Sequence, residues 1–65
     1  KKAMRILSAA EPGDLENTAT AGRLAFKIGI SGTDEAGRKM VGRLLKADLL
    51  AIGPNGLIQG DNCVT

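Results

Sequence analysis

The chain contains no histidine, tryptophan or tyrosine, and it has a single cysteine. Without an imidazole, acid–base or nucleophilic catalysis would have to use isolated carboxylates, hydroxyls or the lone thiol of Cys63. One cysteine forms neither an internal disulfide nor a structural zinc site, and the carboxylates are scattered singly along the chain. We therefore expect a non-catalytic protein with no cofactor and no metal.

Aromatic side chains are almost missing, because Phe26 is the only one. RNA and single-strand modules that stack bases on aromatic rings are therefore disfavoured. The core has to be built from Leu, Ile, Val, Met and Ala, which suits packed helices better than a sandwich of strands. These two observations favour a small, mainly helical domain.

Length and charge set further bounds. Sixty-five residues make one domain, and nine Lys and Arg against seven Asp and Glu give a net charge of +2. This charge permits a nucleic-acid partner without requiring one. The N-terminal apolar stretch is interrupted by Arg5 and Ser8, so it predicts neither a signal peptide nor a membrane span. We expect an intracellular protein, cytoplasmic or nuclear, and a piece excised from a longer chain because residue 1 is not Met.

Apolar spacing predicts three helices, over residues 2–11, 18–28 and 35–48. Pro12-Gly13 ends the first helix. Asn17 or Thr18 caps the second, and Thr33 caps the third without a full capping box, because residue 36 is Ala. Residues 29–32 form a tight connector in which Gly29 takes a left-handed conformation.

The C-terminal third of the chain changes to an extended pattern. Two apolar runs, 49–52 and 57–59, surround the sequence Gly53-Pro54-Asn55-Gly56, which predicts a β-hairpin with a positive φ at Gly56. Residues 60–65, which include Cys63, have no period and are predicted to be a tail or linker.

The third helix has an apolar side and a basic side. The apolar side consists of Gly37, Met40, Val41, Leu44 and Leu45, and the opposite side consists of Arg38, Lys39, Gly42, Arg43 and Lys46. Glycine in mid-helix costs about 1 kcal/mol relative to alanine, so Gly42 indicates a close approach. The approaching group is either a ligand or the second helix, and the sequence leaves both interpretations open.

The order of these elements resembles the winged helix-turn-helix family over about residues 2–59. Residues 21–31 resemble its second helix and turn, residues 41–50 the end of its third helix, and residues 52–58 its wing. The resemblance implies an α+β, mainly α fold: a three-helix bundle with a C-terminal hairpin wing, forming one domain over residues 1–59. It also implies a DNA-binding role, for example in transcription regulation, as a monomer in isolation.

In such proteins the third helix lies in the major groove of duplex DNA, while the second helix and the wing touch phosphates. Transferred to this chain, the resemblance implies a DNA-binding set comprising Arg38, Lys39, Gly42, Arg43 and Lys46, with Thr33 at the start of the third helix, Arg23 and Lys27 on the second, and Asn55 in the wing.

Two features depart from a DNA-binding pattern. Asp34 and Glu35 put negative charge where the helix dipole would otherwise attract a phosphate, and the wing has no Lys or Arg. They favour an alternative, a protein-interaction module that docks through the same surface or through Leu57 and Ile58. An ordinary solvated helix face, or a structural piece of a larger protein, also fits the charges.

Overall fold

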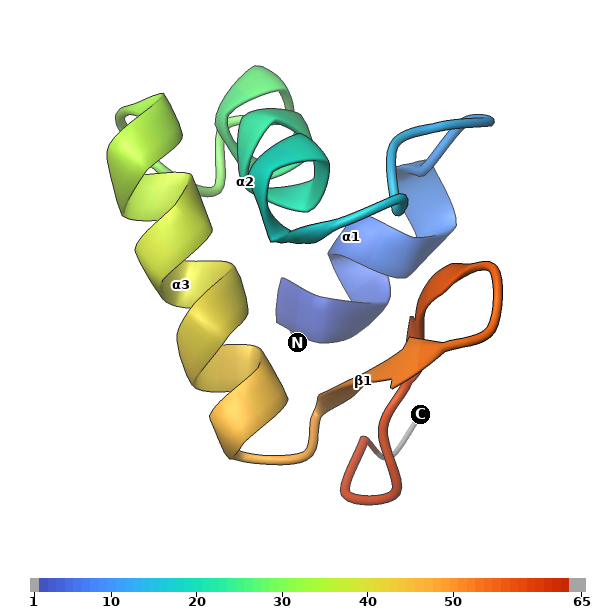
Figure 1. Cartoon of the computed structure of the whole chain (residues 1–65). Helices are drawn as coiled ribbons and strands as arrows, with labels where there is room; N and C mark the ends of the chain where they lie inside the picture. The colour runs from blue at the N-terminus through green and yellow to red at the C-terminus, as the bar shows by residue number, and fades with distance from the viewer. Residues whose placement is uncertain (1, 64–65) are drawn as a thin grey trace.

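The computed structural model describes residues 2–63 and contains three α-helices followed by a two-stranded antiparallel hairpin (Figure 1). The elements are α1 (Lys2–Ala9), α2 (Thr18–Lys27), α3 (Asp34–Lys46), β1 (Leu50–Gly53) and β2 (Gly56–Gln59). The α+β, mainly α class is thus confirmed. None of the helices within residues 2–63 combines the length and the apolarity that a membrane crossing requires.

Side-chain caps start α2 and α3 where the sequence predicts. The Asn17 side chain accepts a hydrogen bond from the Thr20 N–H, and the Thr20 hydroxyl accepts one from the Asn17 N–H, each at 3.0 Å. The Thr33 hydroxyl accepts from the Ala36 N–H at 3.0 Å, and Ala36 has no polar group with which to reciprocate. These bonds satisfy N–H groups that have no partner within a helix.

The C-terminal ends of α2 and α3 share one geometry. The chain leaves α2 through Gly29, at φ 81°, and the Ile30 N–H donates to the Ala25 carbonyl at 2.9 Å. It leaves α3 through Asp48, at φ 60°, and the Leu49 N–H donates to the Leu44 carbonyl at 2.9 Å. The left-handed residue reverses the backbone and closes the last turn. Asp48 therefore lies outside α3, which ends two residues earlier than predicted.

The first helix also ends two residues early, at Ala9. The Glu11 N–H donates to the Asp14 carboxylate and the Asp14 N–H donates to the Glu11 carbonyl, both at 2.9 Å. This local turn around Pro12 uses backbone groups that a longer helix would need.

The core lies between the three helices and the hairpin. Ile6 of α1, Val41 of α3 and Leu50 of β1 are its largest fully buried side chains. The other buried apolar residues are Ala3, Ala21, Leu24, Ala25, Met40, Leu44, Leu57 and Cys63. The apolar side predicted for the third helix therefore does face inward, with Leu45 only partly buried.

Two glycines bring α2 and α3 together. A Cβ atom on Gly37 would overlap the Gly22 carbonyl, and a Cβ on Gly22 would lie 2.6 Å from the Arg38 nitrogen. Gly42 has no such neighbour, because a Cβ there would meet no atom of residues 2–63 within 4 Å. The interpretation of Gly42 as a packing contact with the second helix is therefore wrong.

The hairpin pairs Gly53 with Gly56 and leaves Pro54 and Asn55 at its tip. Gly56 has the expected positive φ, 128°. The Leu57 N–H donates to the Leu15 carbonyl at 2.6 Å, so the α1–α2 connection runs beside β2. Ile52 is 80% exposed, whereas Leu57 is 5% exposed.

Residues 60–63 pack against the domain, although we expected a tail there. The Gly60 N–H donates to the Leu49 carbonyl at 3.1 Å, and the Asn62 N–H donates to the Asp48 carbonyl at 2.8 Å. Cys63 is 8% exposed and belongs to the core, so its predicted placement in a mobile tail is corrected. Residues 64–65 of the expected tail lie outside the described residues.

Two alanine substitutions on α3 test the helix contact. Gly37→Ala should lower the free energy of unfolding by about 1–3 kcal/mol, because the new methyl group forces α2 and α3 apart. Gly42→Ala, the control on the same helix, should raise it by about 1 kcal/mol, since the methyl group enters open space. Urea unfolding monitored by circular dichroism measures both, and equal effects at the two positions would contradict the contact.

Candidate nucleic-acid interface

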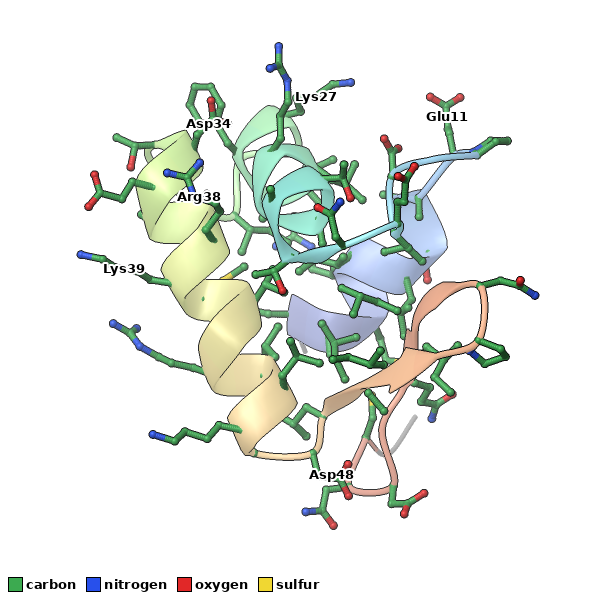
Figure 2. The ribbon with its side chains drawn as sticks, in the orientation of Figure 1. Glu11, Lys27, Asp34, Arg38, Lys39 and Asp48 are labelled. Atoms are coloured by element: carbon green, nitrogen blue, oxygen red, sulfur yellow. The ribbon has the colours of Figure 1, made fainter. Side chains whose placement is uncertain are left out.

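The exposed side of α3 is basic over almost three turns. Arg38, Lys39, Gly42, Arg43 and Lys46 are all exposed, as the spacing predicts, and together they are called the basic face. No acidic residue occurs between positions 38 and 46. Figure 2 shows Lys39 pointing outward from α3, away from the other helices. A continuous row of cations on one helix is a surface suited to a polyanion.

Arg38 is placed by the contact between the helices. Its Cγ would lie 2.7 Å from a Cβ on Gly22, so the aliphatic part of the side chain crosses α2 where α2 has no side chain. The Arg38 side chain therefore leaves the surface at the point where α2 and α3 meet. Long cationic side chains commonly pack their stems on a surface while keeping the charge in water.

The cations of α2 adjoin the basic face without lying on it. Arg23 and Lys27 are exposed and four residues apart, so they share one flank of α2. In Figure 2, Lys27 leaves α2 in a different direction from that of Lys39 on α3. Figure 2 thus shows Lys27 and Lys39 on different sides of the helix pair.

The first turn of α3 is acidic. Glu35 forms an ion pair with Lys39 at 3.4 Å, and both side chains are largely exposed. Within residues 2–63, the Asp34 Oδ1 atom is buried and has no hydrogen-bond partner. Both carboxylates interact favourably with the N-terminal end of the helix dipole. Thr33 uses its hydroxyl oxygen to cap the helix, so this end of α3 is poorly suited to accept a phosphate.

Asn55 is separated from the basic face. The hairpin tip and α3 lie on opposite sides of the molecule (Figure 1). Asn55 lines a hollow of about 370 Å³ together with Glu11 and Glu16. Two carboxylates beside Asn55 oppose the approach of a phosphate. The structure therefore does not bring Asn55 together with the other predicted contact residues.

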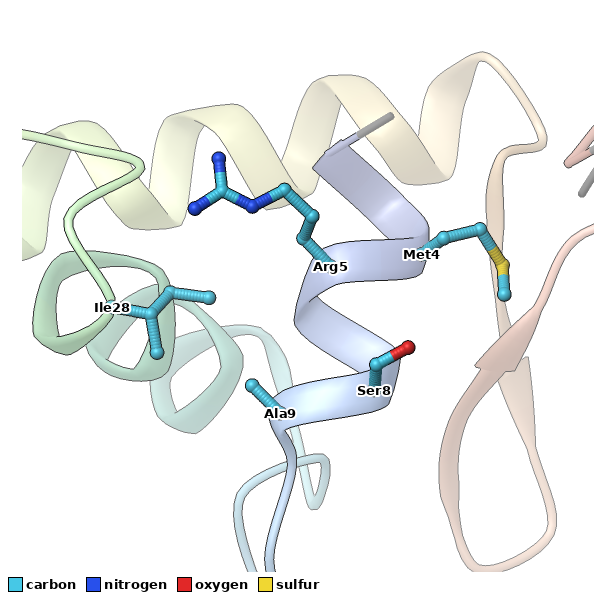
Figure 3. A pocket seen from close by; sticks show the side chains of 5 residues that line it. All are labelled: Met4, Arg5, Ser8, Ala9 and Ile28. Atoms are coloured by element: carbon cyan, nitrogen blue, oxygen red, sulfur yellow. The ribbon is translucent and has the colours of Figure 1, made fainter.

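A second hollow lies on α1, where Arg5 and Ile28 are among the lining side chains (Figure 3). Its volume is about 460 Å³, and it is open to solvent. Among residues 2–63, only Arg5 and Ser8 contribute polar side chains to its lining, whereas small-molecule sites bury their ligand between several converging polar groups. No group of three potential metal-ligating side chains occurs in the part of the chain that the structure describes.

Sequence reasoning missed the two glycines that set this surface. Gly22 had no assigned role, and Gly37 was expected on the apolar side without its contact to α2. A small residue on each of two helices that are joined by a short connector was the available sign that the two helices pack closely.

No protein-family model, curated protein or solved structure matches the chain.

Neutralising Glu35 tests whether the basic face attracts a polyanion. Glu35→Gln should increase the affinity for a random-sequence DNA duplex, because it frees Lys39 and removes a charge that repels phosphate. An exposed ion pair is worth up to about 1 kcal/mol, which corresponds to a change of up to about fivefold. Glu16→Gln removes one carboxylate beside the hairpin tip and should leave the affinity unchanged. Retention on a heparin column ranks the two variants, and equal retention would contradict a binding role for the basic face.

Proposed function

We propose that this chain is a winged helix-turn-helix domain that binds duplex DNA non-catalytically, with α3 in the major groove. The observation that supports it most strongly is the basic face, with Arg38, Lys39, Arg43 and Lys46 exposed and no acid among them. The three helices and the terminal hairpin are in the order of that family. Electrostatic attraction to phosphates supplies most of the non-specific affinity of such domains.

The dimensions of α3 fit this role. Its 13 residues span about 20 Å at 1.5 Å per residue, and the major groove, about 12 Å wide, admits one α-helix. Arg38 and Arg43 have the planar, two-pronged donor geometry that suits the guanine edge. Lys39 and Lys46 supply charge for the flanking phosphates, and Arg23 and Lys27 extend the positive potential over α2.

The hairpin has a smaller part in this proposal. No Lys or Arg occurs after Lys46 in the chain. Asn55 shares its hollow with Glu11 and Glu16, so we leave Asn55 out of the proposed contact set. The wing then supports the fold, through the Leu57–Leu15 backbone hydrogen bond, without contacting DNA.

One observation favours a second candidate, a protein-interaction module. Ile52 and Ile58 of the hairpin are large apolar side chains that are 80% and 48% exposed, and exposed apolar surface is a feature of protein-interaction sites. Leu57, which we had expected to dock on a partner, is buried and unavailable. Ile52 pairs with Leu57 and Ile58 pairs with Ala51, so the two isoleucines lie on opposite faces of the hairpin. A docking surface on the hairpin would therefore use Ile52, the more exposed of the two.

Fluorescence anisotropy with a labelled random-sequence duplex tests the DNA proposal, at salt concentrations of about 50 and about 200 mM. Wild-type affinity should fall steeply with salt. Arg43→Ala should weaken binding about tenfold, as expected for a lost contact of about 1–3 kcal/mol, and Lys46→Ala should reduce the salt slope by about 1. Arg5→Ala is the charge-matched control on α1 and should bind like the wild type.

Absence of binding at the lower salt concentration, by protein that circular dichroism shows to be folded, would contradict the DNA proposal. Equal losses in Arg43→Ala and Arg5→Ala would also contradict it, because they would report net charge alone. Either result would favour the protein-interaction candidate, for which Ile52→Ser is the variant that should abolish binding to a partner.

A further inference from the structure

Gly42 stands alone among the helical glycines of α2 and α3 in having no contact that explains it. Gly22 and Gly37 are needed for the close approach of the two helices, whereas a Cβ on Gly42 would meet nothing within 4 Å in the described part of the chain. Its φ is negative, so an L-residue would fit without strain. Glycine in a helix interior destabilises the helix relative to other residues. The folded domain itself therefore gains nothing from glycine at this position.

The neighbours of Gly42 are mostly cations. On a helix, residues three and four positions apart lie side by side. Gly42 accordingly adjoins Arg38 and Lys39 in the preceding turn and Lys46 in the following turn, all of them exposed. A stretch of bare backbone lies in the middle of the basic face, between long and positively charged side chains. Such a surface is complementary in charge and in shape to a polyanion that approaches the helix closely.

We propose that Gly42 is the point at which the backbone of α3 comes closest to the base-pair edges of duplex DNA. This inference rests on the proposed function and adds a determinant of how deeply the helix enters the groove. An α-helix with its side chains is about 10–12 Å across, close to the width of the major groove, about 12 Å. A side chain at the centre of the leading face would act as a spacer between the backbone of α3 and the groove floor. Gly42 removes that spacer, while Arg38, Lys39 and Lys46 reach past it to bases and phosphates.

Gly42→Gln tests the inference without changing charge. Glutamine is a good helix former, so the melting temperature should rise by about 3–6 °C. The affinity for the random-sequence duplex should nevertheless fall about tenfold, a loss of about 1.4 kcal/mol, because the new side chain keeps α3 out of the groove. Ala9→Gln introduces the same side chain at an exposed position of α1 and should leave the affinity unchanged.

Opposite shifts in stability and affinity for Gly42→Gln, with Ala9→Gln unaffected, would support the inference. If the wild type binds the duplex and Gly42→Gln binds it equally tightly, the inference is overturned and the proposed function stands. A lower melting temperature would also overturn it, since it would show that the position is needed within the domain. If the wild type does not bind duplex DNA, both the inference and the proposed function fail.

Discussion

The contact between the backbones of α2 and α3 at Gly22 and Gly37 is the constraint on which the rest of the surface depends. Neither position has room for a Cβ atom, so any larger residue would push the helices apart. The separation of the helices in turn determines where Arg38 leaves the surface, because its stem crosses α2 at Gly22. It also sets the tilt of α3, and with it the direction in which Lys39, Arg43 and Lys46 point. A packing requirement in the interior thus determines the arrangement of charge outside.

Charge is distributed unevenly over this scaffold. Six of the nine basic residues belong to α2 and α3, whereas Glu11, Asp14 and Glu16 lie in the α1–α2 connection, beside the hairpin. The net charge of +2 therefore understates the local potential over α3, and it also conceals an acidic side. Within residues 2–63, the Glu35–Lys39 pair is the only ion pair, so the other cations of the basic face remain available to a ligand. In the proposed function, this asymmetry favours the approach of a polyanion to α3 over its approach to the hairpin.

Local features were predictable from the sequence, and tertiary ones were not. Periodicity and capping residues located the helices, the cap at Thr33 and the exposed residues of α3, because these depend on neighbours within one turn, and they narrowed the other cap to Asn17 or Thr18. The roles of Gly22 and Gly37 depend on the distance between two helices. The docking of residues 60–63 depends on carbonyls of Asp48 and Leu49, and Asp48 adopts a left-handed conformation that is commoner for glycine. Ile52 and Leu57 are partners at the same level of the hairpin, and only Leu57 lies on the strand that hydrogen-bonds to the α1–α2 connection, so the exposure of Ile52 also depends on tertiary placement.

The central claim is that α3 is the surface that meets DNA, and amide chemical shifts test it most directly. When a random-sequence duplex is titrated into isotopically labelled protein, the amide chemical shifts of residues 38–46 should change most, and those of residues 23–27 should change less. The amide chemical shifts of residues 52–58 should not change, because the hairpin tip lies on the side of the molecule opposite α3. Shifts concentrated in the hairpin, or none at low salt, would contradict the account.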